Sequence, residues 1–148
     1  MLKDNVNVLG KLDITLTGPS GEVKDTRQVP NLVVQTGLDF IASRMKDTTY
    51  DVMSHMAVGE DNTSPVLADT TLAAEVSGSR TALTSTNVST DQITYTTTFG
   101  PGVGTGALVE AGVFNAASGG TMLCRTIYDV INKGAADTLT ISWTVTIN

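Results

Sequence analysis

Ten residues near the end of the chain, 138–147, constrain its fold more than any other segment, because polar and apolar side chains alternate there without a break. The apolar positions are Leu139, Ile141, Trp143, Val145 and Ile147, with Thr or Ser at every position between them. Successive side chains of a β-strand point to opposite faces, so residues 138–147 are predicted to form a strand with one buried and one hydrated face. Such a strand needs neighbouring strands and a second layer to cover its apolar side.

The same preference for strands extends over most of the sequence. The 148 residues include 24 threonines and 16 valines, and β-branched side chains fit a pleated surface better than a helix. Strands are predicted over residues 11–17, 22–28, 54–59, 80–88, 92–99, 108–115, 121–130 and 138–147. Short strands separated by turn residues at such regular spacing indicate a mainly all-β fold, an antiparallel β-sandwich or a jelly roll.

One short α-helix is predicted near residues 37–46. Leu38, Ile41 and Met45 recur at helical spacing, and Thr36 precedes them as a candidate N-cap. The helix is therefore expected to turn these three apolar side chains toward the core.

A chain of this length suits one domain. Residues 10–148 are predicted to form the sandwich, and residues 1–9 an N-terminal arm or a short edge strand. The expected members of a single core are Leu12, Ile14, Leu38, Ile41, Phe99, Phe114, Leu139, Ile141, Trp143 and Val145, with Phe99, Phe114 and Trp143 as its aromatic anchors. The arm carries the candidate partner-contact residues, which are Leu2, Val6, Val8 and Leu9.

The charge balance disfavours two classes of partner. Nine basic residues stand against 15 acidic ones, for a net charge of −6, and the basic residues are scattered rather than clustered. Binding to nucleic acid or to an anionic membrane requires clustered Lys and Arg, so neither partner is expected. Cys124 is the only cysteine, which excludes an internal disulfide framework. The start of the chain has no apolar run of signal-peptide length, and we expect synthesis in the cytoplasm.

The residues that carry chemistry do not form a recognisable catalytic pattern. Residues 102–107 match a GxGxxA motif, but the sequence after them predicts a strand rather than the helix of a dinucleotide site, so a hairpin loop is expected. Ser43 and Lys46 have the serine–lysine spacing of penicillin-recognising enzymes without the partner motifs. His55 and Cys124 are a conceivable nucleophilic pair, although a cysteine on a strand is more often buried.

Acidic residues offer two further interpretations. Residues 60–62, together with Asp69, supply oxygen atoms for a calcium ion, but the spacing of an EF-hand is missing and a solvated loop is favoured. Glu110 and Arg125 lie on adjacent predicted strands, where they are expected to form a structural ion pair. We therefore expect a protein that is not an enzyme, with no cofactor, no metal site and no small-molecule substrate.

Several segments, taken in order, resemble small structural proteins of tailed bacteriophages. The segments that carry the resemblance are Val29 to Ala42, Ser54 to Gly59, Asp69 to Glu75, Ile93 to Phe99, Glu110 to Asn115, Met122 to Thr126 and Leu139 to Thr146. This group includes capsid decoration (cement) proteins and tail-fibre-like proteins, and the resemblance covers roughly residues 29–148. It implies a virion component without catalytic activity.

Within that group the sequence favours a capsid decoration protein that stabilises the head shell. The chain has no coiled-coil or collagen-like shaft of the kind that tail fibres need. The alternative is a tail, neck or tail-fibre component, with binding to the host surface as a further role. The resemblance implies a homotrimer that contacts the major capsid protein on the virion. We further expect residues 1–9 and the loop 60–68 to make the contacts outside the trimer.

Overall fold

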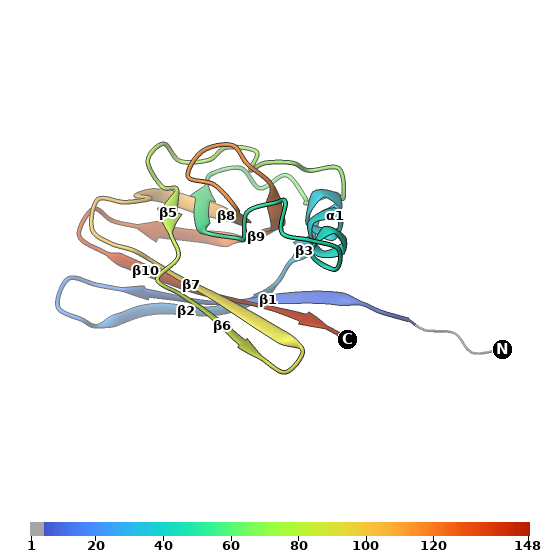
Figure 1. Cartoon of the computed structure of the whole chain (residues 1–148). Helices are drawn as coiled ribbons and strands as arrows, with labels where there is room; N and C mark the ends of the chain where they lie inside the picture. The colour runs from blue at the N-terminus through green and yellow to red at the C-terminus, as the bar shows by residue number, and fades with distance from the viewer. Residues whose placement is uncertain (1–4) are drawn as a thin grey trace.

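Residues 5–148 are described by the computed structural model, and they form two antiparallel sheets packed face to face (Figure 1). The elements in chain order are β1 (Val8–Thr17), β2 (Val23–Pro30), β3 (Leu32–Val33), α1 (Gln35–Arg44), β4 (His55–Gly59), β5 (Thr81–Ala82), β6 (Ser85–Ser89), β7 (Gln92–Phe99), β8 (Gly106–Phe114), β9 (Met122–Lys133) and β10 (Thr138–Ile147). Sheet A has the strand order β2-β1-β10-β7-β6, and sheet B has the order β3-β9-β8-β4-β5. The predicted all-β sandwich with one short helix is confirmed.

The central strand of sheet A is β10, which pairs with β1 on one side and β7 on the other. Its predicted alternation is confirmed as far as Val145, because the apolar side chains from Leu139 to that residue are fully buried between the sheets. The prediction is wrong for Ile147, which is 44% exposed. Ile147 lies at the open end of the sandwich, where it lines a surface groove instead of the core.

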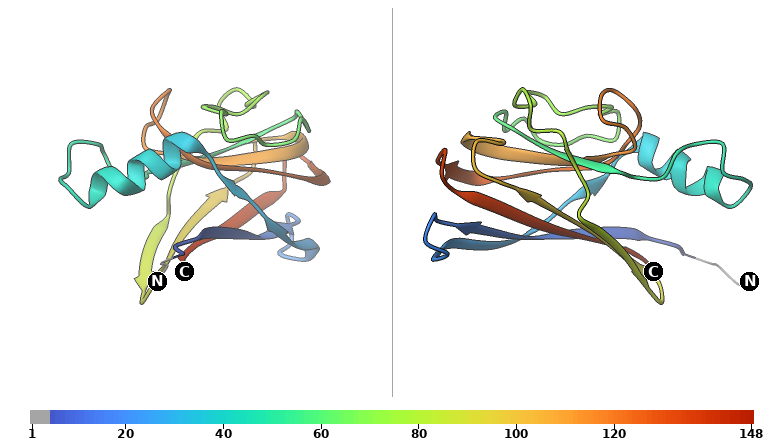
Figure 2. Two further views of the ribbon diagram at one scale, coloured as in Figure 1. Left: turned by 90° about the vertical axis from the view of Figure 1, so that its right-hand side faces the viewer. Right: turned by 60° about the vertical axis from the view of Figure 1, so that its left-hand side comes forward.

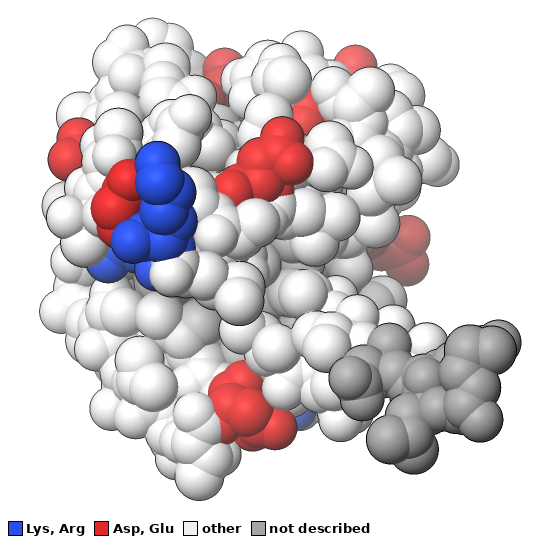
Figure 3. All heavy atoms as spheres, turned by 45° about the vertical axis from the view of Figure 1, so that its right-hand side comes forward, with Lys and Arg blue, Asp and Glu red and all other residues white. Residues whose placement is uncertain are grey.

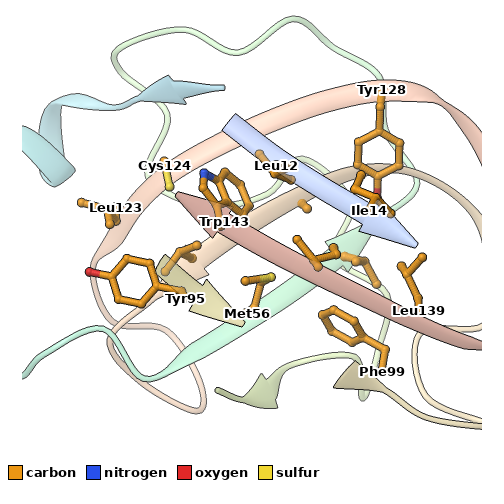
Figure 4. Packing of buried hydrophobic residues seen from close by; sticks show 14 of the residues in the cluster. Leu12, Ile14, Met56, Tyr95, Phe99, Leu123, Cys124, Tyr128, Leu139 and Trp143 are labelled. Carbon is orange, nitrogen blue, oxygen red and sulfur yellow. The ribbon is translucent and has the colours of Figure 1, made fainter. Parts of the chain in front are cut away.

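The core is divided into two clusters rather than the single one expected. The main cluster lies between the sheets and contains Trp143 and Phe99, together with Leu12 from β1 and Met56 from β4 (Figure 4). Phe114 is also buried, but it belongs to a second cluster. The other members of this second cluster are Val34, Ala57, Leu72 and Met122. The division arises because the chain after β4 covers the outer face of sheet B and buries a second apolar layer there.

The helix differs from its prediction in its start and in its buried face. It begins at Gln35, and Val34 is its N-cap residue, with no side-chain capping bond. Gly37 and Phe40 are its buried residues, whereas Leu38 and Ile41 are half-buried. A Cβ atom at Gly37 would collide with the backbone of β9. The close approach of helix and strand at this glycine therefore decides which face turns inward.

Thr36 and Met45 also depart from the predicted helix. The Thr36 hydroxyl donates a hydrogen bond to the backbone oxygen of Met122, at 2.8 Å, instead of capping the helix. Met45 follows the last helical residue and is 88% exposed, because the end of α1 projects beyond both sheets (Figure 2).

Two segments cross from one sheet to the other, although the sequence predicted a hairpin loop for one and a single strand for the other. The glycine-rich residues 100–105 join β7 of sheet A to β8 of sheet B, so they form a crossover and not a hairpin loop. Gly102 and Gly104 have positive φ angles of 79° and 63°, which side-chain-bearing residues rarely adopt. The predicted strand 80–88 is split, with β5 in sheet B and β6 in sheet A.

The predicted boundary between arm and sandwich at residue 9 is also corrected. Val8 and Leu9 belong to β1, where they lie opposite Ile147 and Thr146 of β10. The pairing extends to Asn7, whose backbone N–H donates to the last residue of the chain at 2.6 Å. Two of the four contact candidates are therefore part of sheet A, because β10 is long enough to pair with them.

Candidate interaction surface

The remaining two residues of the predicted contact arm lie at or before the start of the described chain. Val6 is 70% exposed and precedes the first strand. Leu2 lies outside the described residues. Among the described arm candidates, Val6 and Leu9 are exposed, and Val6 is the one that lies outside the sheet.

His55 and Cys124 are held apart by a strand. His55 lies on β4 and Cys124 on β9, and β8 runs between these two strands in sheet B. Cys124 is fully buried, and this burial raises the pKa of its thiol well above the usual value. The His55 Nδ1 atom lies 2.7 Å from the Ser54 hydroxyl. Cys124 thus acts as a small apolar core residue.

The other candidate chemical groups take part in local structural contacts. The Ser43 hydroxyl donates to the backbone oxygen of Phe40 at 2.7 Å, and Lys46 lies 3.5 Å from the carboxylate of Asp47. The Asp61 carboxylate accepts hydrogen bonds from Thr63, which lower its pKa. Among residues 5–148, His, Cys, Asp and Glu side chains form no group of three or more that is suited to a metal. No helix in this part of the chain has the length and apolar composition needed to cross a bilayer.

The predicted ion pair between Glu110 and Arg125 is confirmed, and it is buried on the outer side of sheet B. Two guanidinium nitrogens of Arg125 donate to one carboxylate oxygen of Glu110, at 2.8 and 2.9 Å. Both side chains are almost completely shielded from solvent. A buried pair of charges is tolerated only when further hydrogen bonds satisfy the remaining polar atoms.

Those further bonds come from the chain that follows β4. The backbone N–H groups of Ala73 and Ala74 donate to Glu110, at 3.0 and 2.7 Å. Arg125 donates to the backbone oxygen of Thr63 at 2.9 Å and to the Asp69 carboxylate at 3.2 Å. The ion pair therefore fixes the covering segment, residues 60–80, on the outer face of sheet B. The sequence indicated the ion pair but not the loop residues that bind to it. Nothing in the sequence shows that residues near 63–69 and 73–74 contact Glu110 and Arg125.

A second arginine holds the end of this covering segment. The Arg80 guanidinium lies 3.6 Å from the centre of the Phe114 ring and pairs with Glu75 at 2.7 Å. It also donates to the backbone oxygens of Ala116 and Gly119, in the β8–β9 connection. Arg80 thus links the covering segment to the neighbouring loop.

The outer face of sheet A has a different chemistry, because hydroxyl side chains cover most of β7 and β10 there, beside Lys11 and Asp13 of β1. Thr94 faces Thr144 across β7 and β10 with 3.1 Å between the hydroxyl oxygens, and Thr96 faces Ser142 at 3.2 Å. Between Thr138 and Thr146, β10 carries only Thr and Ser on this face. Figure 3 shows another side of the molecule, on which basic side chains lie against acidic ones at one place and further acidic side chains stand apart.

The β6 edge of sheet A is exposed and uncharged. All five residues of β6 are exposed, and β7 is its only strand neighbour among residues 5–148. The ten residues between Arg80 and Asp91 carry no charge. Strand edges in natural proteins are usually protected by charged residues, prolines or bulges. At the opposite edge of the sheet, β2 carries three such charged residues, Lys24, Asp25 and Arg27. The β6 edge has no charged residue or proline of this kind.

An apolar groove of about 530 Å³ adjoins the β6 edge. It lies between the outer part of α1 with the chain that follows it and the inner face of sheet A. Its lining residues are Phe40, Ile41, Arg44, Met45, Val52, Met53, Thr86, Ile93, Tyr95 and Ile147. The exposed β6 edge and this apolar groove together form the surface that is best suited to contact another protein.

Comparison with known proteins identified no relative of this chain. No protein-family model, no curated protein and no solved structure matches the chain. Two features therefore bear on function: the surfaces of sheet A described above and the resemblance of the sequence to phage structural proteins.

Proposed function

We propose that this chain is a non-enzymatic structural protein of a tailed-bacteriophage virion, a decoration protein that stabilises the head shell. The observation that supports this most directly is the combination of a hydroxyl-covered face and an uncharged edge on sheet A. Such surfaces pack against protein without desolvating ions, which suits a component that assembles with copies of itself and with a shell. The resemblance of the ordered segments to phage structural proteins supports the same role.

Contact with the shell is proposed for two sites outside the sandwich core. One is the N-terminal segment that ends at Val6. The other is the tip of the loop 60–68, where Val66 and Leu67 expose apolar side chains. Asp69 accepts a hydrogen bond from the backbone of Val66 at 3.0 Å and also pairs with Arg125. The loop therefore presents its apolar tip from a fixed position, which lowers the entropy lost on binding.

Cryo-electron microscopy and mass spectrometry of purified particles test the proposal. The expected result is density for the sandwich on the outer surface of the head, in contact with the major capsid protein. Density on the tail or neck would overturn decoration in favour of the alternative role. Absence of the chain from purified particles would overturn a virion role altogether.

Two variants test the proposed contacts. Deletion of residues 2–6 leaves β1 and the pairing of Asn7 with Asn148 intact, and Leu67→Lys places a charge at the loop tip. Both variants should fold as the unmodified chain does and should detach from particles at lower denaturant or salt concentration. Val23→Lys, an equally exposed apolar residue in the β1–β2 hairpin, is the control and should leave attachment unchanged.

A further inference from the structure

We infer that the β6 edge pairs with the β6 edge of a second copy about a twofold axis, which joins the two A sheets into one continuous sheet. The inference rests on the self-association within the proposed function, and it replaces the trimer implied by the resemblance with a dimer. It does not depend on where the protein is located on a particle.

The backbone of β6 provides the first argument. The strand pairs with β7 from Ser85 opposite Thr96 to Ser89 opposite Gln92. Its other side has no neighbouring strand within the described chain. Alternate N–H and C=O groups on that side form a row that another strand can complete. A partner for this edge must therefore offer an extended strand.

Charge identifies a second copy as that partner. Antiparallel pairing of β6 with itself, centred on Asn87, brings Thr86 opposite Val88 of the second copy and Asn87 opposite its equivalent. No like charges meet, because residues 81–90 contain none, and two β-branched side chains form a favourable cross-strand pair. The opposite edge lacks this neutrality, because β2 carries Lys24, Asp25 and Arg27, whose charges would have to be matched by any strand paired with it.

The apolar groove gives the pairing additional buried surface. The second half of α1 and the chain after it project beyond the sheets on the side where β6 lies (Figure 2). Met45 is 88% exposed, Val52 57% and Val88 69%. A strand added beside β6 extends sheet A beneath this projection and removes these side chains from water. Twofold pairing closes after two copies, and the edges that remain on the joined sheet are the two charged β2 strands.

Sedimentation equilibrium of the full chain at micromolar concentration tests the inference. The expected mass is that of two chains. Asn87→Lys and Asn87→Asp each place like charges opposite each other at the axis, and each should raise the dissociation constant about tenfold or more. An equimolar mixture of the two variants should restore the dimer, because opposite charges then meet. Gln28→Lys adds the same charge to the opposite edge of sheet A and should have no effect.

Asn87→Cys provides an independent test of the register. Under mild oxidation this variant should form a dimer through a disulfide at position 87, since directly opposed residues bring their Cβ atoms close together. A monomer at all concentrations, a mass of three chains, or a dimer that is insensitive to both charged variants would each overturn the inference. A monomer that still decorates particles overturns only this inference, whereas a dimer absent from particles overturns only the proposed function.

Discussion

The outer face of sheet B is covered by the chain's own residues 60–80, whereas the outer face of sheet A is open to solvent. Sheet B carries buried charges on this side, with Arg125 and Glu110 both shielded from water. Sheet A carries rows of hydroxyl groups on its central strands. The inner faces of both sheets, in contrast, are mainly apolar and share the main core, with Thr97 as a buried polar residue of β7.

This difference shows two uses of polar side chains on one sandwich. A buried ion pair fixes one arrangement of a covering segment, because any displacement leaves a charge unpaired in a dry environment. A hydroxyl-covered face is satisfied by water or by neighbouring hydroxyls and fixes no covering segment. Sheet B is therefore completed within the chain, and sheet A is left available for assembly.

Arg125→Ala should lower the free energy of unfolding by about 3–5 kcal/mol, because Glu110 then stays buried without its partner. Chemical denaturation followed by tryptophan fluorescence measures this loss. Limited proteolysis under native conditions should also cut the chain between residues 60 and 75.

Trp143→Ala is the matched control for this prediction. It should cost a similar 3–5 kcal/mol through the cavity it leaves in the main core, and it should not expose the covering segment selectively. Its unfolding is followed by circular dichroism. Equal protease sensitivity of the two variants at equal stability would contradict the proposed role of Arg125.

Arg80→Ala should lower the free energy of unfolding by about 1–2 kcal/mol through loss of the contact with the Phe114 ring and of the hydrogen bonds to the β8–β9 connection. Hydrogen exchange should increase around residues 75–80 and 116–119 and stay unchanged in sheet A. Arg80→Lys retains the charge without the planar group, so it should recover only part of the stability. Full recovery with lysine would show that charge alone holds this corner.

Acidification should weaken the corner where β9 of sheet B turns into β10 of sheet A. The backbone N–H of Gly134 and the side chain of Lys24 donate to the Asp137 carboxylate and lower its pKa. The unfolded chain has a pKa near the ordinary value of about 4. The carboxylate therefore stabilises the fold above that value, and the contribution is lost as pH falls through the lower folded pKa.

The expected result is a melting temperature that falls with pH below about 5, and falls less steeply in Asp137→Asn. Differential scanning calorimetry of both proteins at matched ionic strength measures the difference. Identical pH profiles for the two proteins would show that Asp137 does not contribute to the acid sensitivity.

Thr144→Val, on the open face of sheet A, should change the free energy of unfolding by less than about 0.5 kcal/mol. The substitution removes the hydroxyl contact with Thr94 but keeps the β-branched shape. Denaturation curves of the two proteins should overlap. A loss comparable to that of Arg125→Ala would show that the hydroxyl rows hold the sheet together and would remove the contrast between the two faces.

The sequence alone determined the strands whose side chains alternate strictly. The bounds of β7 and β10 agree with the prediction, since β10 alternates over ten residues and β7 alternates except at Thr97. The pairing of Glu110 with Arg125 was also predictable, because the two residues lie on consecutive predicted strands, which are usually neighbours in a sheet. These features depend on local pattern, which period-2 geometry converts directly into structure.

Tertiary structure decided the features that depend on contacts between distant segments. The buried face of α1 follows from the close approach of Gly37 to β9, which helical spacing does not reveal. The second apolar cluster, the assignment of β5 and β6 to different sheets, and the inclusion of Val8 and Leu9 in β1 likewise depend on which strands become neighbours. The β6 edge became visible only once the strand order was known, because whether a strand is an edge is a property of the whole sheet and not of its own residues.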